Sequence, residues 1–419
     1  MKLLAWGLVF ISCSLTAQIE LSFQKDLFPE GIAVHPETKK VYLNSLMHNK
    51  IVRSNLDGTN AEEFTGKDEY GYLSGFGMTI KGDTLYALGN SLPKPQNKSI
   101  FLLLNTKTGK LITSYALKET GFAYLNDLAV GSNGAIFITD SESDKIYTIN
   151  KQKDKLEVFL THDELKHCNG IAISEDYKFL YLASYTSGLR VVDITTKRLV
   201  NKPNQYKGID GLKWYKNSLI ALVNTRRDAT QNGVYRFQLN PNQSEITNEK
   251  KIAAFQEETD IPTTFAILKD SLYFVDDSQM DNMNQETYQI RDTSKLEPYN
   301  LMGIPLNPNV YTKNYCTEIG RFDLTFDSNE VAGAYLLKHK NALGAVWGKL
   351  EGLKMTGRWT DADGSGDIIL TFTEDFSFFT ADYRSDDEPK KWHIDSWHGA
   401  LRPNGDISFE FNAKTFTCE

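Results

Sequence analysis

The fold is decided by a repeated motif whose fullest copy reads Cys168-Asn-Gly-Ile-Ala-Ile-Ser-Glu-Asp-Tyr-Lys-Phe-Leu-Tyr-Leu-Ala183. An amide side chain and a glycine open an apolar strand, a polar turn follows, and a strand of aliphatic and aromatic residues comes next. Related openings occur at Glu30-Gly-Ile-Ala-Val, Phe76-Gly-Met-Thr-Ile, Asn126-Asp-Leu-Ala-Val, Asp210-Gly-Leu-Lys-Trp and Thr263-Thr-Phe-Ala-Ile. Six units at a period of roughly 40 to 50 residues are typical of a propeller or solenoid.

Each opening is followed by a second strand and by turn signals, and no long stretch has helical periodicity. Examples of these second strands are Lys40-Val-Tyr-Leu-Asn, Asp83-Thr-Leu-Tyr-Ala-Leu, Ala135-Ile-Phe-Ile-Thr and Ser271-Leu-Tyr-Phe-Val. This pattern predicts a six-bladed β-propeller over residues 18–300, an all-β ring that leaves few exposed sheet edges. We expect residues Gln18 to Leu27 to supply an outer strand that closes the last blade.

The C-terminal quarter of the chain has a different pattern. Polar residues and prolines predict a linker at residues 301–314, and alternating strands with hairpin turns predict a small antiparallel β domain, a barrel or a sandwich, over residues 315–419. Its tryptophans are expected in the core and at the rim. The segment that begins at Asp361 resembles the start of an EF-hand loop, but Phe372 stands where that loop needs a glutamate, so a hairpin turn is expected.

Composition and the N-terminus exclude some classes of protein. A net charge of −8 argues against binding a nucleic-acid backbone. Residues 1–17 have the pattern of a secretory signal peptide, with an alternative as a lipoprotein signal that ends at Cys13. No segment of the sequence is apolar enough to span a membrane. These features predict export, to the periplasm or the medium.

The remaining cysteines have two expected roles. Cys316 and Cys418 bracket the C-terminal domain and, in an oxidising compartment, are expected to form a disulfide. Cys168 is then left over. We expect it to be a buried, unpaired thiol, because a catalytic cysteine needs a basic and exposed environment.

The openings of the repeat predict a cluster at the propeller axis. The first strand of each blade lines the central channel, so Glu30, Asn126, Asn169 and Asp210 are expected to meet there, with Phe76 and Thr263 from the other two blades. Oxygen ligands without sulfur or histidine suit a hard cation, most readily Ca²⁺, with Mg²⁺, Mn²⁺ or Zn²⁺ as alternatives. Two carboxylates at one axis also repel unless a cation or a proton offsets them. The alternative is that these residues only shape turns.

A family resemblance rests on Phe28-Pro-Glu-Gly, Leu125-Asn-Asp, Cys168-Asn-Gly-Ile-Ala-Ile and Ile209-Asp-Gly. These segments resemble the SMP-30/gluconolactonase family and the related paraoxonase-like calcium propellers. The resemblance implies a divalent metal in the channel with Glu30, Asn169 and Asp210 as direct ligands, and Asn126 beside the metal or the substrate. It also implies that Asp210 is the general base that activates water.

The chain departs from this pattern at two places. Gluconolactonases carry an arginine two residues before the asparagine of blade three, where this chain has Tyr124, which argues against a sugar-acid lactone. The segment Gly75-Phe-Gly-Met lacks the histidine that paraoxonases use.

The predicted function is metal-dependent hydrolysis of a small lactone or ester, with Asn126, Tyr124, Phe76 and Thr263 contacting the substrate. The alternative is a non-catalytic, metal-containing binding propeller whose C-terminal domain contacts a surface or a glycan. A condensing enzyme similar to strictosidine synthase is a third candidate. His35, His48, His162 and His167 show no metal-ligand spacing, and the chain has no Gly-x-Ser-x-Gly motif.

Overall fold

The computed structural model describes residues 17–93, 98–117, 123–226, 228–240, 242–257, 259–284, 286–306, 311–327, 330–337, 342–402, 411–415 and 417–418. The chain divides into two compact units, Met1–Leu306 and Asn307–Glu419. The signal-peptide segment up to residue 16, including Cys13, lies outside the described residues.

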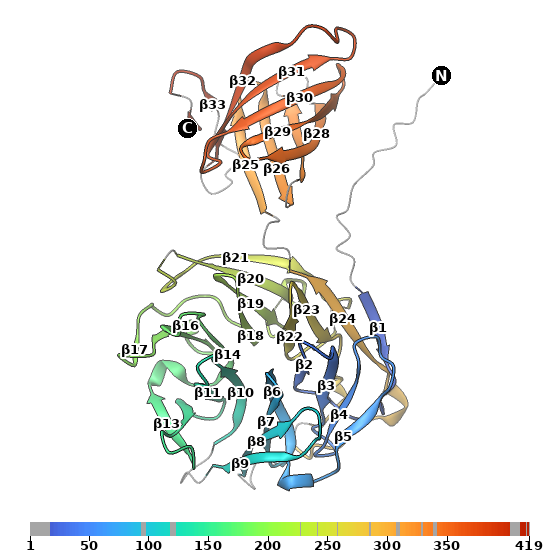
Figure 1. Ribbon diagram of the computed structural model, residues 1–419, viewed down its shortest axis with the longest axis vertical. Coiled ribbons are helices and arrows are strands. Elements are labelled where there is room, and N and C mark those ends of the chain that lie inside the picture. The colour runs from blue at the N-terminus through green and yellow to red at the C-terminus, as the bar shows by residue number, and fades with distance from the viewer. Residues whose placement is uncertain are drawn as a thin grey trace. The chain divides into compact units, whose positions relative to one another are not determined.

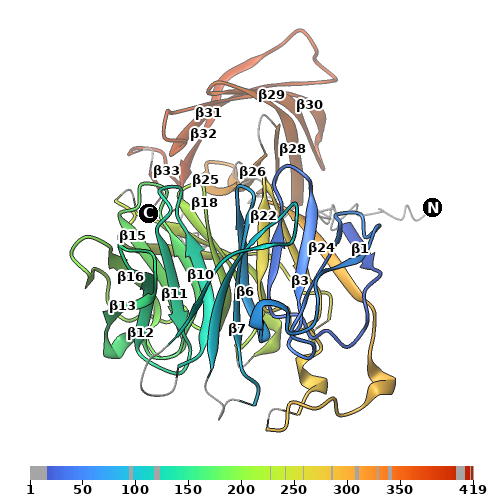
Figure 2. The ribbon, with the colours of Figure 1, turned by 60° about the horizontal axis from the view of Figure 1, so that its bottom comes forward.

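The first unit is the predicted six-bladed propeller, with four strands in each blade of its described residues (Figure 1). Blade 1 contains β2 (Ile32–Val34), β3 (Lys40–Asn44), β4 (Ile51–Asn55) and β5 (Glu62–Thr65), and blade 2 contains β6 (Ser74–Lys81), β7 (Thr84–Asn90), β8 (Ser99–Asn105) and β9 (Leu111–Ala116). Blade 3 contains β10 (Leu125–Val130), β11 (Ile136–Asp140), β12 (Lys145–Ile149) and β13 (Leu156–Thr161). Figure 2 shows the inner strands β6 and β10 of neighbouring blades side by side.

The second half of the ring repeats this order. Blade 4 contains β14 (Cys168–Ile173), β15 (Phe179–Ser184), β16 (Gly188–Asp193) and β17 (Arg198–Leu199). Blade 5 contains β18 (Ile209–Tyr215), β19 (Ser218–Val223), β20 (Gly233–Leu239) and β21 (Ile246–Ala253). Short 3₁₀ turns are the helices of the described residues: η1 (Glu69–Gly71), η3 (Asp163–Leu165), η4 (Ala229–Gln231), η5 (Met280–Asn282) and η6 (Thr293–Lys295).

Blade 6 joins the two ends of the propeller. Its strands are β22 (Phe265–Leu268), β23 (Ser271–Val275), β24 (Tyr299–Pro305) and, on the outside, β1 (Ala17–Leu21). β1 pairs antiparallel with β24, with Ala17 opposite Gly303 and Leu21 opposite Tyr299. The expected N-terminal closing strand is therefore confirmed, and it covers the outer edge of β24.

The blades adhere through their aliphatic and aromatic second strands. Between blades 4 and 5, for example, Tyr181 stacks on Trp214 with ring centroids 5.7 Å apart, and the buried Leu219 and Phe237 belong to the same cluster. Each fully buried side chain of this kind contributes about 2 kcal/mol relative to an exposed one. This packing fixes neighbouring inner strands against each other at the axis.

The second unit is a closed antiparallel barrel, which decides between the two expected architectures. Its eight strands follow chain order and are β25 (Tyr311–Thr317), β26 (Gly320–Asp327), β27 (Glu330–Leu337), β28 (Ala342–Glu351), β29 (Lys354–Asp361), β30 (Gly364–Phe372), β31 (Phe378–Ser385) and β32 (His393–Leu401). β32 pairs back to β25. A small ribbon of β33 (Phe411–Asn412) and β34 (Thr417–Cys418) follows.

The structure tests two predictions made for this unit, a disulfide and a hairpin turn. Cys316 and Cys418 form a disulfide, with Cα atoms 6.0 Å apart. The EF-hand-like segment is the tight turn between β29 and β30, where Asp361 pairs with Gly364, so the hairpin interpretation is confirmed. Among the described residues, no helix has the length and apolar character needed to cross a membrane.

Candidate functional site

The inner strands of four blades begin with a β-bulge. The ladder register shifts between Gly75 and Met78, between Leu125 and Leu128, between Cys168 and Ile171, and between Ile209 and Leu212. Two residues of the inner strand then face one residue of its neighbour, which bends the strand and re-aims the side chains at the bulge. The residues at these bulges include Phe76, Asn126, Asn169 and Asp210, so the local backbone explains why the repeat openings reach the channel.

The glycine after an opening residue has a steric reason. A Cβ on Gly31 would collide with the carbonyl oxygen of Phe76, and one on Gly170 would collide with that of Asp210. A Cβ on Gly77 would lie 2.7 Å from the carbonyl oxygen of Asn126. The inner strand of each of these blades therefore rests on the opening residue of the next, and glycine permits that close approach.

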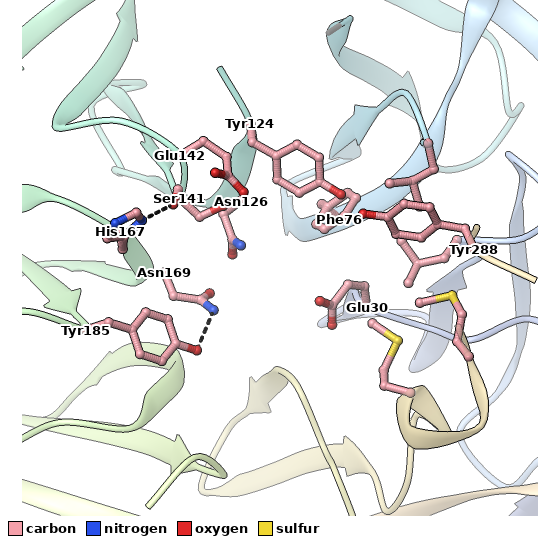
Figure 3. Close-up of a pocket in the computed structure, with 14 residues that line it drawn as sticks. Glu30, Phe76, Tyr124, Asn126, Ser141, Glu142, His167, Asn169, Tyr185 and Tyr288 are labelled. Carbon is pink, nitrogen blue, oxygen red and sulfur yellow. Dashed lines mark hydrogen bonds between the residues drawn. The ribbon is translucent and has the colours of Figure 1, made fainter. Parts of the chain in front are cut away.

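These openings line a pocket of about 360 Å³ at the mouth of the channel. Glu30, Asn126 and Asn169 point toward one another in this pocket (Figure 3). Asp210 lies deeper, in a small adjoining cavity that Glu30, Phe76, Asn126 and Asn169 also line. The structure thus brings together the four oxygen-bearing side chains that were predicted to meet at the axis.

The pocket has one apolar and one polar wall. On the apolar wall, the rings of Phe76 and Tyr124 meet edge to face with centroids 4.8 Å apart. Further apolar contacts come from Leu46, Leu92, Met280, Met283 and Tyr288. The polar wall contains Ser141, Glu142, His167 and Tyr185, and there His167 Nδ1 lies 2.8 Å from the carbonyl oxygen of Ser141 (Figure 3).

Asp210 is held by amide groups. The Nδ2 group of Asn224 donates a hydrogen bond of 2.7 Å to Asp210 Oδ2 and another of 2.9 Å to the carbonyl oxygen of Pro262. Burial raises the pKa of Asp210 to about 7; hydrogen bonds from Asn224 and Asn169 oppose this shift, and the charge of Asp127 adds to it. A carboxyl group with a pKa near neutrality is suited to exchange protons with water.

Glu30 provides the test of whether a cation fits here. Burial, followed by the charges of Asp210 and Asp127, raises the pKa of Glu30 well above its ordinary value, against a hydrogen bond from Thr263. The buried Oε2 atom of Glu30 has no hydrogen-bond partner among the described residues. Glu30 and Asp210 therefore resist being ionised at the same time, and one oxygen of Glu30 lacks a hydrogen-bond partner among the described residues. A divalent cation would offset both charges and would coordinate this oxygen.

The donor set is limited to two carboxylates and two amides. Within the described ranges, no group of three or more Asp, Glu, His or Cys side chains is arranged to hold a metal ion. Any cation at the axis would therefore depend on Asn126 and Asn169 in addition to Glu30 and Asp210. Amide oxygens are ordinary ligands for Ca²⁺ and poorer ones for soft metals.

A buried ion pair in the channel was not predicted. Lys213 Nζ lies 3.1 Å from Asp127 Oδ2 and 3.3 Å from Asp127 Oδ1, and the Asp127 side chain is only 5% exposed. Both residues break the repeat: Asp127 stands where four other openings have glycine, and Lys213 stands where the others have alanine or threonine. These two departures from the repeat were the signal in the sequence from which the ion pair could have been predicted. Lys213 is paired with Asp127, and among the described residues no basic side chain forms an ion pair with Glu30 or Asp210.

A second set of polar residues, also missed, supports the openings from the ends of the second strands. Asn44 Oδ1 accepts hydrogen bonds from the backbone N–H groups of Glu30 and Gly31, at 3.2 and 2.8 Å. Asp140 Oδ1 accepts one from the Tyr124 N–H at 2.9 Å. The corresponding strand ends in the other blades are also polar: Asn90, Ser184, Asn224 and Asp276. The repeated polar residue after an aliphatic strand was visible in the sequence.

The remaining predicted site residues are placed as follows. Phe76 and Tyr124 line the pocket. Thr263 lies behind Glu30, where its Oγ1 donates to the Glu30 carbonyl oxygen at 3.4 Å, and Thr264 lines the deeper cavity instead. Cys168 is a free, buried cysteine, and burial raises the pKa of its thiol.

Residues 28–213 match the family model described as the SMP-30/gluconolactonase/LRE-like region. The propeller is therefore similar to this family over the matched segment. The matched segment runs from the residue before Pro29 through the fifth opening, so it spans the positions of Glu30, Asn126, Asn169 and Asp210. The resemblance drawn from the repeat openings is therefore confirmed.

Three solved structures illustrate the similarity of this chain to other proteins. A gluconolactonase from Xanthomonas campestris has 13% sequence identity and a TM-score of 0.46, with 69% of this chain and 90% of that chain covered. The calcium-binding protein regucalcin from Agrobacterium tumefaciens has 16% identity and a TM-score of 0.46, with coverage of 69% and 94%. A virginiamycin B lyase from Staphylococcus aureus has 18% identity and a TM-score of 0.45, with coverage of 74% and 95%. No curated protein sequence matches the chain.

Proposed function

We propose that the propeller is a metal-dependent hydrolase of small, neutral lactones or esters, with Ca²⁺ as the cation. The proposal rests on the convergence of Glu30 and Asp210 with two amide side chains at the base of a pocket of about 360 Å³. At this place Glu30 Oε2 has no hydrogen-bond partner among the described residues. The similarity of residues 28–213 to the SMP-30/gluconolactonase/LRE-like region supports the same reaction class.

In this proposal the cation would be held by Glu30, Asn126, Asn169 and Asp210, which line one small cavity. When bound, the cation would polarise the substrate carbonyl and favour ionisation of a nearby water. Asp210 accepts the proton of the attacking water, and Asn224 fixes the orientation of Asp210 through its 2.7 Å hydrogen bond. Asn44 holds the backbone that carries Glu30.

The pocket lining favours a neutral substrate with an apolar part. The described lining residues of the pocket include no arginine or lysine, so the many hydroxyl groups of a sugar-acid lactone would find no cationic hydrogen-bond donor there. Phe76 and Tyr124 with Met280 and Met283 offer a broad apolar surface beside the polar base. An acyl chain or hydrophobic ring would rest on this wall, while the ester or lactone group reaches the axial oxygens.

The test combines metal analysis with a substrate screen. We expect one divalent ion per chain by elemental analysis, and hydrolysis of at least one member of a panel of aliphatic lactones and aryl esters. EDTA should abolish the activity and Ca²⁺ should restore it. A matched panel of sugar-acid lactones should be hydrolysed less well.

Two results would contradict the proposal. Hydrolysis that is unaffected by EDTA would exclude the metal-dependent mechanism. A tightly held ion with no turnover on the whole panel would favour the alternative, a non-catalytic binding propeller that retains its metal for ligand binding.

Export is a separate part of the proposal. Residues 1–17 would be removed as a signal peptide, and the Cys316–Cys418 disulfide suits an oxidising compartment. The intact mass of the exported protein should correspond to a chain that starts at Gln18; a lipid-modified chain that starts at Cys13 would contradict this. The expected surface or glycan contact of the C-terminal domain gains no support from the structure.

A further inference from the structure

The barrel contains a cavity that side chains leave unfilled. Eight-stranded barrels have an interior just wide enough either to be packed by side chains or to hold one small ligand. Most of this interior is packed, but about 200 Å³ remains open between Phe322, Tyr335, Trp359, Tyr383 and Trp397. An apolar cavity of about 150 Å³ is enough to hold benzene, so this cavity has room for a monocyclic aromatic molecule with a short substituent.

The aromatic lining is fixed by specific contacts. Phe322 stacks on Tyr335 with centroids 4.7 Å apart, and Trp359 meets Tyr383 edge to face at 6.0 Å. The indole Nε1–H of Trp359 donates to the carbonyl oxygen of Arg384 at 3.2 Å. The tryptophan therefore uses its polar atom on the barrel wall and presents its ring to the cavity. A lining that is already ordered loses little conformational entropy on binding.

Glycines make space for this lining. A Cβ on Gly344 would collide with the ring of Tyr335, and a Cβ on Gly366 would lie 2.7 Å from Nε1 of Trp359. The sequence therefore keeps two strand positions without side chains where large rings need to lie. The two glycines therefore allow the rings of Tyr335 and Trp359 to occupy their positions beside the cavity.

The rim of the cavity is acidic. Asp361 and Asp363 line it, and the described lining residues include no lysine, arginine or histidine. The Tyr335 hydroxyl donates a 2.7 Å hydrogen bond to Asp361 Oδ2, and the Asp363 backbone N–H donates one of the same length to Asp361 Oδ1. These two donors fix the orientation of the Asp361 carboxylate at the edge of an aromatic cavity.

We infer that the barrel is a binding site for a small aromatic amine, with the ring in the cavity that Phe322 and the two tryptophans line and the ammonium group at Asp361. The aromatic faces attract a cation as well as bury a ring, and the rim carboxylates supply its counter-charge. A neutral molecule of the same shape would keep the apolar contacts and lose the charge-assisted hydrogen bond. This site is in the second unit and does not depend on the function proposed for the propeller.

The experiment is a calorimetric titration of the full chain with 2-phenylethylamine and with its neutral analogue 2-phenylethanol. We expect saturable binding of one amine per chain, at least about tenfold tighter than the alcohol, because charge-assisted hydrogen bonds are stronger than neutral ones. The Asp361→Asn variant should bind both molecules with similar, weaker affinity. Glu374→Gln, an exposed charge in the turn after β30, at the other end of that strand, is the matched control and should keep the preference.

A second variant tests the location. Ile319, a partly buried residue that also lines the cavity, can be replaced by tryptophan to fill the space. Ile319→Trp should abolish binding of both molecules while the melting temperature shows that the barrel is folded. Four results would overturn the inference. They are equal affinity for the amine and the alcohol, an amine preference that persists in Asp361→Asn, unchanged binding in Ile319→Trp, and no binding at millimolar amine.

Discussion

The propeller and the barrel are both closed antiparallel β structures, yet they place opposite kinds of side chain at their centres. Along β26 of the barrel, Phe322, Leu324 and Phe326 alternate with more exposed residues and point inward. In the propeller, the central positions are the polar openings of inner strands, such as Asn126 and Asp210. The barrel has an apolar interior with an acidic rim, and the propeller has a polar axis with an apolar wall.

The difference follows from how each sheet closes. A barrel is one sheet whose inward face is its core, so every second residue must be apolar. In a propeller the sheets are arranged around the axis and pack face to face, so the apolar faces are satisfied between blades. Only the inner strand of each blade meets the axis. The axis is therefore free to carry charge, provided that each charge has a partner, as Asp127 has in Lys213.

The largest expected effect tests whether the polar axis is catalytic. Asp210→Asn should lower kcat/KM by about 10³-fold, which is about 4 kcal/mol of transition-state stabilisation, because an amide cannot accept the proton of water. Initial rates on the best lactone or ester measure it. Asp163→Asn, at a side chain 89% exposed, is the matched control. Similar losses in both variants, or none in Asp210→Asn, would contradict the assignment.

The next effect tests the cost of an unpaired charge at the axis. Lys213→Met should destabilise the metal-free propeller by about 3 kcal/mol, because it leaves Asp127 buried without its partner. Lys216→Met breaks a pair between half-exposed groups, Lys216 and Asp270, and should cost much less, because solvent screens an exposed ion pair. Urea denaturation in EDTA measures both. Equal costs for the two variants would show that the channel pair is not effectively buried.

Calcium should distinguish the two units. At a free concentration one hundred times its Kd, Ca²⁺ should stabilise the propeller by about 2.7 kcal/mol and leave the barrel unchanged. Hydrogen exchange with mass spectrometry reports peptides from the two units separately. Glu30→Gln should remove the effect, while Glu37→Gln, at an exposed glutamate, should keep it. Protection of the barrel alone would place the cation elsewhere.

The smallest effect concerns pH, because the pKa values of buried carboxyl groups in the propeller and of an ion-paired carboxyl group in the barrel shift in opposite directions. Burial raises the pKa of Asp210 to about 7 and that of Asp260 to about 6, whereas hydrogen bonds from Arg358 and Ser365 lower the pKa of Asp386 to about 2. For the two raised groups, the stabilising contribution is complete below the ordinary value of 3.8 and is lost as pH rises through 6 and 7. For Asp386 it is present above that value and is lost as pH falls toward 2.

In EDTA, lowering the pH from 7.5 to 4.5 should therefore increase protection of the propeller and leave the barrel nearly unchanged, and the barrel should weaken only below pH 4. Hydrogen exchange corrected for the intrinsic pH dependence measures both trends. Asp260→Asn and Asp210→Asn should flatten the propeller trend, and Asp386→Asn should not. A parallel trend in both units would contradict the assigned shifts.

The sequence by itself determined those features of the protein that depend on periodic or local patterns of residues. The recurring openings predicted the number of blades, and alternation predicted an antiparallel C-terminal domain, because a side chain's face in a strand depends only on its position. Equivalent positions of a repeat meet at its symmetry axis, so the sequence alone assigns Glu30, Asn126, Asn169 and Asp210 to one site.

What only the tertiary structure decided depends on which distant segments meet. The pairing of Asp127 with Lys213 joins blades three and five, and the support of Asp210 by Asn224 depends on the end of the second strand in blade five. Closure of β32 onto β25 makes the C-terminal domain a barrel and not a sandwich. The cavity between Tyr335 and the tryptophans depends on the volumes of side chains from several strands. Pairwise contacts and residual volume are properties of the packed chain, and no periodic pattern encodes them.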